Sequence, residues 1–64
     1  MTYDEAVKVA DVVQWADGGC VDCAAKLAQH LVEKFPEVDW VAAFRESLAA
    51  NKRNWTPKTL GLES

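Results

Sequence analysis

The sequence predicts an all-α fold, a compact three-helix bundle that ends in a short helical turn. Apolar residues recur at spacings of three and four over three successive stretches, which is typical of helices that bury one face. Turn residues separate the stretches, and no stretch alternates apolar and polar residues as a strand does. We therefore expect one domain over residues 1–64, with helices at about 3–17, 20–35 and 40–51 and the turn at 57–60.

The first predicted helix begins with a capping box, because Thr2 and Glu5 stand three residues apart. Two glycines follow its last apolar residue, and glycine readily adopts the left-handed conformation of a helix C-cap. Between these signals lies one apolar stripe, formed by Ala6, Val9, Ala10, Val13 and Ala16.

The second predicted helix carries an apolar arc of roughly 200°, about twice the width that a surface helix needs. An arc of this width predicts the central helix of the bundle, packed by both neighbours. Pro36 ends the helix, since the residue before a proline avoids the helical conformation.

The third predicted helix begins after Asp39, a plausible N-cap, and its buried stripe includes Trp40 and Phe44. The final turn follows the same logic, with Thr56 as its N-cap and Gly61 as its end.

The charge is unevenly distributed along the chain. Residues 1–50 carry nine acidic and four basic side chains, whereas residues 51–64 carry one acidic and three basic side chains. An acidic body repels nucleic acid and attracts basic surfaces, so we expect a protein partner with a basic surface and no direct nucleic-acid binding. No apolar run approaches the about 20 residues of a membrane span, and the acidic N-terminus does not resemble a secretory signal. We therefore expect a cytoplasmic protein without a membrane partner.

Cys20 and Cys23 form a C-x-x-C pair at the start of the second predicted helix. Such a pair can be a redox site, or one half of a zinc site shared across a dimer. We interpret it as a pair of small buried residues at the start of a core helix, and expect no metal and no cofactor. His30, the only histidine, lies two helical turns beyond Cys23, and no serine near it in sequence completes a catalytic triad. The protein is therefore expected not to be an enzyme.

Two tryptophans and seven acids are the candidate partner-binding residues. Trp40 falls on a buried stripe. Trp15 falls at the end of the first predicted helix and Trp55 in the C-terminal tail, and each either covers the core edge or anchors a partner. The acids would steer a basic partner, or else form a solvated surface that only aids solubility. They are Asp4, Asp11, Asp17, Asp22, Glu33, Glu37 and Asp39.

In its small size, its acidity and its all-helical pattern, the whole chain resembles the small phage-encoded anti-CRISPR proteins. Those proteins share no common motif, so no residue roles carry over. The resemblance implies a stoichiometric inhibitor in the cytoplasm of a bacterial host. It would bind a CRISPR effector complex on its nucleic-acid channel or on a subunit interface, as a monomer or weak dimer. The alternatives are a C-x-x-C thiol or zinc module that acts as a dimer, and a phage structural or accessory protein.

Overall fold

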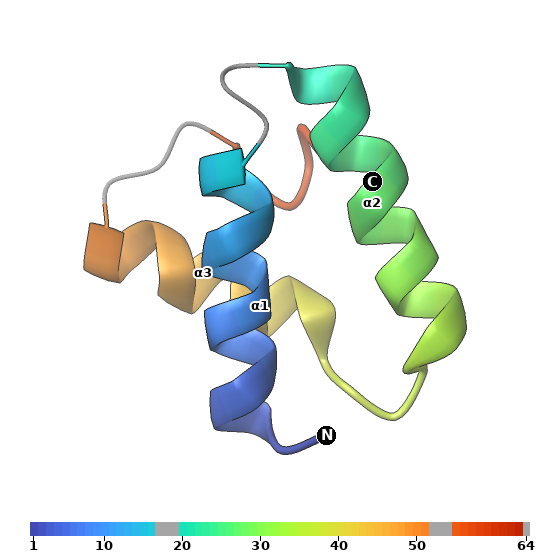
Figure 1. Ribbon diagram of the computed structural model, residues 1–64, viewed down its shortest axis with the longest axis vertical. Coiled ribbons are helices and arrows are strands. Elements are labelled where there is room, and N and C mark those ends of the chain that lie inside the picture. The colour runs from blue at the N-terminus through green and yellow to red at the C-terminus, as the bar shows by residue number, and fades with distance from the viewer. Residues whose placement is uncertain (17–19, 52–54, 64) are drawn as a thin grey trace.

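A computed structural model of the chain describes residues 1–16, 20–51 and 55–63. It contains three helices and, among these residues, no strand, so the predicted all-α fold is confirmed (Figure 1). The helices are α1 (Tyr3–Ala16), α2 (Val21–Lys34) and α3 (Trp40–Asn51). These bounds agree with the sequence prediction to within one residue at each described end, and the expected end of the first helix at residue 17 lies outside the described residues.

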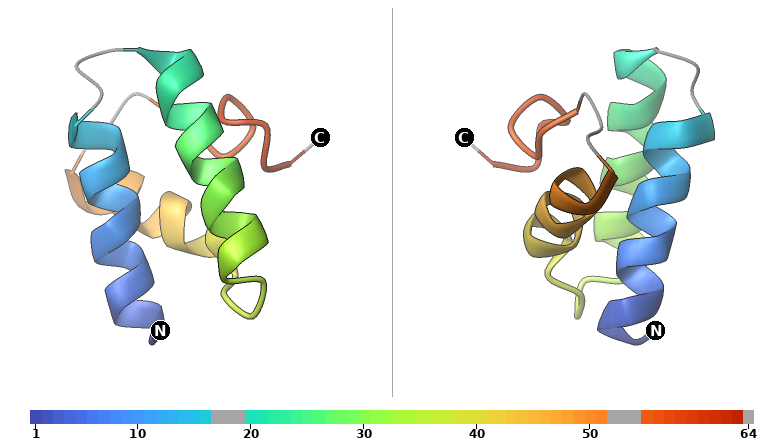
Figure 2. Two further views of the ribbon diagram at one scale, coloured as in Figure 1. Left: turned by 45° about the vertical axis from the view of Figure 1, so that its right-hand side comes forward. Right: turned by 90° about the vertical axis from the view of Figure 1, so that its left-hand side faces the viewer.

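The elements form two layers. Helices α1 and α2 run antiparallel beside each other, while α3 and the C-terminal segment lie together behind them (Figures 1 and 2). Helix α1 packs most extensively against α3 and less extensively against α2. The prediction that the second helix is central is therefore wrong, because α1 is the helix with two well-packed neighbours. Small residues explain the difference, since Ala6 and Ala10 on α1 are fully buried and allow close approach.

The core is built largely from small side chains. Among the residues that the structure describes, five of the ten buried hydrophobic residues are alanines, and Phe44 and Leu60 are the largest fully buried apolar side chains. Trp40 is only 3% exposed, as predicted, and its indole N–H donates a 3.0 Å hydrogen bond to the carbonyl oxygen of Phe35. Because alanine has a small side chain, a core of this composition buries little apolar surface per residue.

The helix starts predicted from local sequence are confirmed. The Thr2 backbone N–H donates to the Glu5 carboxylate at 2.8 Å, and the Glu5 N–H donates to the Thr2 hydroxyl at 3.2 Å. This reciprocal pair is the expected capping box. Asp39 caps α3, because its Oδ1 atom accepts the Ala42 N–H at 3.1 Å.

The C-terminal turn also forms as predicted. The Thr56 hydroxyl accepts the Thr59 N–H at 3.1 Å and so caps the start of the turn. At its end, the Leu62 N–H donates to the Pro57 carbonyl oxygen at 2.9 Å. Gly61 lies between them with a φ of +77°, the left-handed conformation that closes a helical turn.

The C-terminal segment belongs to the core. Leu60 is fully buried, and its carbonyl oxygen accepts a hydrogen bond from the Gln29 side chain on α2 at 3.4 Å. The backbone N–H of Trp55 donates to the side-chain oxygen of Gln14 on α1 at 3.3 Å. The segment is therefore tied to both helices of the front layer.

Candidate protein-binding site

The charges of three carboxylates act on Tyr3, an exposed aromatic residue at the start of α1. Partial burial, then the charge of Glu46 and its hydrogen bond, and then the charges of Asp39 and Asp4 raise the pKa of Tyr3. The Tyr3 side chain is 43% exposed, so its ring remains accessible. We refer to Tyr3, Asp4, Asp39 and Glu46 as the acidic cluster.

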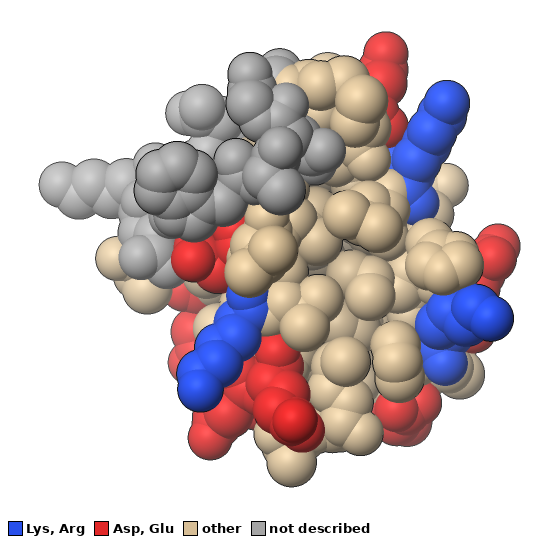
Figure 3. Space-filling view, viewed as in Figure 1, with Lys and Arg blue, Asp and Glu red and all other residues tan. Residues whose placement is uncertain are grey.

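The fold brings the acidic cluster together from two helices. Tyr3 and Asp4 begin α1, Asp39 caps α3, and Glu46 lies about two turns further along α3. Acidic side chains are prominent at the lower left of the molecular surface, near the N-terminal end of α1 (Figure 3). Asp4 and Asp39 were predicted from the sequence, but Tyr3 and Glu46 were not. Only the packing of α1 on α3 makes them neighbours, and no sequence spacing reveals that packing.

Asp11 has a structural role. It is half-buried, and its Oδ1 atom accepts a 3.3 Å hydrogen bond from the fully buried hydroxyl of Ser47 on α3. Its carboxylate therefore joins two helices of the core.

The other predicted acids lie apart from the acidic cluster. Asp22 and Glu33 are exposed on α2, and Glu37 is exposed in the connection from α2 to α3. Acidic side chains appear on both sides of a broad band of uncharged residues in Figure 3, so the acids do not form one continuous patch on this face. Asp17 lies outside the described residues.

The structure describes the side chain of only one of the two candidate tryptophan anchors. Trp55 is half-buried and packs against the hydrophobic core, so it covers the core edge. Trp15 lies in the last turn of α1, and its side chain is outside the described part of the structure.

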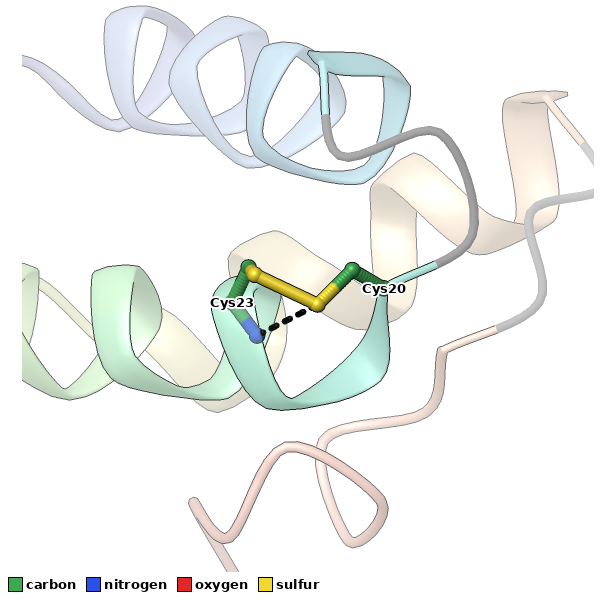
Figure 4. The surroundings of a disulfide bond; sticks show 2 residues. All are labelled: Cys20 and Cys23. Carbon is green, nitrogen blue, oxygen red and sulfur yellow. Dashed lines mark hydrogen bonds between the residues drawn. A yellow bond between two sulfur atoms is a disulfide. The ribbon is translucent and has the colours of Figure 1, made fainter.

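Cys20 and Cys23 form a disulfide bond across the first turn of α2 (Figure 4). Cys20 is half-buried and caps α2, because its sulfur accepts the Cys23 N–H at 3.3 Å. Cys23 is exposed, so the prediction of a buried pair of thiols is wrong. Cys20 and Cys23 lie seven and four residues before Leu27, so the three residues share one side of the helix. Leu27 is exposed, so this side of the helix faces outward.

The disulfide also bears on the zinc alternative. Zinc binds cysteine as the thiolate, and a disulfide sulfur has no thiolate to offer. Within the described ranges, no group of three or more His, Cys, Asp or Glu side chains could hold a metal ion. His30 is exposed on α2.

An apolar groove of about 290 Å³ runs between α1 and α2 on the face away from α3. Val12 is 61% exposed and Leu27 is 42% exposed, although both are hydrophobic. On the face drawn in Figure 3, a broad band of uncharged residues has charged side chains on both sides. The lining residues of the groove are Lys8, Val9, Val12, Val13, Leu27 and Leu31.

None of the helices in the described part of the chain has the length and apolar character needed to cross a membrane. Comparison of the chain with protein-family models, with curated proteins and with solved structures gives no match.

Proposed function

We propose that this protein acts by binding another protein, and that the acidic cluster contacts basic groups of that partner. The observation that supports the proposal is that the charges of three carboxylates, from α1, α3 and the N-cap of α3, all act on exposed Tyr3. Carboxylates attract lysine and arginine over a distance, and an aromatic ring binds their cationic heads and apolar stems at contact. The protein would therefore work as a stoichiometric binder and not as an enzyme.

We further propose that the partner is a CRISPR effector complex in the bacterial cytoplasm. The whole-chain resemblance to anti-CRISPR proteins motivates this choice, and the acidic cluster offers a chemical reason for it. A channel that binds nucleic acid is lined by basic side chains, and clustered carboxylates can occupy the place of phosphates. The protein would then block the channel, or a basic subunit interface, without contacting nucleic acid.

The test uses two variants that each remove three charges. The cluster variant carries Asp4→Asn, Asp39→Ser and Glu46→Gln, in which serine keeps an N-cap for α3. The control carries Asp22→Asn, Glu33→Gln and Glu37→Gln, at exposed sites outside the acidic cluster. Wild type and variants are each titrated against purified CRISPR effector complexes at low and moderate salt.

We expect the cluster variant to weaken binding by about tenfold or more and to reduce its salt dependence. The control should change affinity by about threefold or less, because only its long-range charge effect is lost. Equal losses in both variants would contradict a role of the cluster. If the wild type binds none of the effectors, the proposed partner is wrong.

A second candidate function, thiol–disulfide exchange, is favoured by the exposed disulfide at the start of α2. A partner thiolate would attack the Cys23 sulfur, form a mixed disulfide and release Cys20 as a thiolate. The Cys23 N–H already donates to the Cys20 sulfur, and a helix N-terminus stabilises a thiolate. A second thiolate of the partner would then attack the partner sulfur of the mixed disulfide, so that the partner leaves with a disulfide of its own and Cys23 is released as a thiolate.

Single-cysteine variants test this candidate with oxidised glutathione as the probe. Cys20→Ser leaves the exposed Cys23, which should form a mixed disulfide quickly. Cys23→Ser leaves the half-buried Cys20, which should react more slowly. Mass spectrometry follows both reactions over time. If the Cys20→Ser variant, which retains Cys23, forms no mixed disulfide, thiol–disulfide exchange is ruled out.

A further inference from the structure

We propose that the apolar groove between α1 and α2 is a homodimer interface, covered in solution by a second copy of this chain. This inference does not depend on the proposed function, because the groove lies beside the acidic cluster and shares no residue with it.

Each helix contributes apolar side chains to the groove, and Lys8 on α1 is its one charged lining residue. On α1, Val9 and Val12 are three residues apart, and on α2, Leu27 and Leu31 are four residues apart. These spacings keep the side chains on one face of a helix, as in helices that pack lengthwise against a partner. Leu31 packs into the core, whereas Val12 remains 61% exposed and Leu27 remains 42% exposed. The stripes are thus built for more packing than one copy provides.

The ends of the two stripes carry opposite charges. Glu5 precedes Val9 by four residues on the α1 stripe, and Lys34 follows Leu31 by three residues on the α2 stripe. Because the helices are antiparallel, both charged residues lie at the same end of the groove (Figure 1). Within residues 1–16, 20–51 and 55–63, neither of them forms an ion pair.

This charge pattern selects one arrangement of the two copies. A two-fold axis parallel to the helices would place α1 of each copy against α2 of the other, in antiparallel orientation. Val12 would then face Leu27 of the second copy, and Glu5 would face its Lys34. The result is a four-helix antiparallel layer, a common way to cover such stripes.

The size of the face predicts a weak dimer. The face that carries the groove measures 27 by 22 Å at most. Complete coverage would bury about 600 Å² per copy, less than the about 800 Å² per partner of a standard stable interface. We therefore expect a dissociation constant of about 10–500 µM, which sedimentation equilibrium can measure. A chain that remains monomeric up to about 1 mM would overturn the proposal.

Two valines provide a matched test of the face. Val12 lies in the groove, whereas Val32, which is 39% exposed on α2, lies outside it. Val12→Asp should raise the dissociation constant by about tenfold or more, since it would bury an unpaired carboxylate. Val32→Asp should change it by about twofold or less. Circular dichroism confirms that both variants remain helical, and equal weakening by both would overturn the assignment to the groove.

A charge exchange tests the arrangement. Lys34→Glu alone and Glu5→Lys alone should each weaken the dimer by about threefold to fivefold, because each places like charges together. The double variant restores opposite charges and should dimerise within about twofold of the wild type. The stability of each monomer is measured separately, because Glu5→Lys also breaks the capping box of α1. A double variant as weak as the singles combined would overturn the two-fold arrangement.

Discussion

The buried hydroxyl of Ser47 donates a 3.3 Å hydrogen bond to the Asp11 carboxylate and thereby joins α3 to α1. We expect Asp11→Ala to lower the free energy of unfolding by about 1–2 kcal/mol, because the buried hydroxyl loses this acceptor. Asp4→Ala, on the exposed side of the same helix, should cost about 0.5 kcal/mol. Urea denaturation of both variants measures the difference, and equal losses would contradict a structural role of Asp11.

Gly61 should not tolerate a side chain. Its φ of +77° is strained for other residues, and an added Cβ would lie 2.9 Å from the side-chain nitrogen of Gln29. We expect Gly61→Ala to reduce the free energy of unfolding by about 1–2 kcal/mol. Gly61→Asn is the control, since asparagine adopts the left-handed conformation more readily and should lose less. If alanine and asparagine cost the same, the Gln29 contact and not the backbone sets the penalty.

The capping box should make α1 sensitive to acid. The Thr2 backbone and then its hydroxyl, through hydrogen bonding with Glu5, lower the pKa of Glu5 from its ordinary value of 4.5. A lowered pKa stabilises the fold above pH 4.5, and this contribution disappears as the pH falls through the lowered value. Glu5→Gln keeps the hydrogen-bonding shape without the charge. The stability difference between wild type and this variant, measured from about pH 3 to about pH 7, should shrink in acid.

Reduction of the Cys20–Cys23 disulfide should leave the fold intact. The bond closes a short loop and lies outside the hydrophobic core, so its loss should cost about 2 kcal/mol or less. Urea denaturation with and without reductant measures this cost, and circular dichroism reports the helices. The Cys20→Ser, Cys23→Ser double variant should not respond to reductant. Global unfolding of the wild type on reduction would contradict this expectation.

The features that the sequence predicted correctly are local. Thr2 and Glu5 are three residues apart, Asp39 bonds to the N–H three residues on, and Gly61 ends a single turn. Each depends on backbone geometry within one helical turn, which residue type and spacing determine. The bounds of the helices could be predicted for the same reason, because local capping and turn residues determine them.

The features that the sequence could not predict depend on how the helices pack. The wide apolar arc of α2 indicated a central helix, but its outer part, including Leu27, remains exposed. The acidic cluster joins Tyr3 and Glu46, whose positions become neighbours only when α1 packs on α3. The width of an apolar arc indicates how much apolar surface a helix carries, but it does not indicate which element packs against that surface.

The burial of Leu60 has a consequence for the synthesis of the protein. At about 5–20 residues per second, roughly 2–9 s pass between translation of the last residue of α1 and that of Leu60. A similar time passes between the translation of Gln14 and that of its hydrogen-bond partner Trp55, which lies 41 positions later in the chain. During this time α1 and α2 lack the contacts that Trp55 and Leu60 make with them. The core of the nascent chain is therefore complete only when the final turn docks.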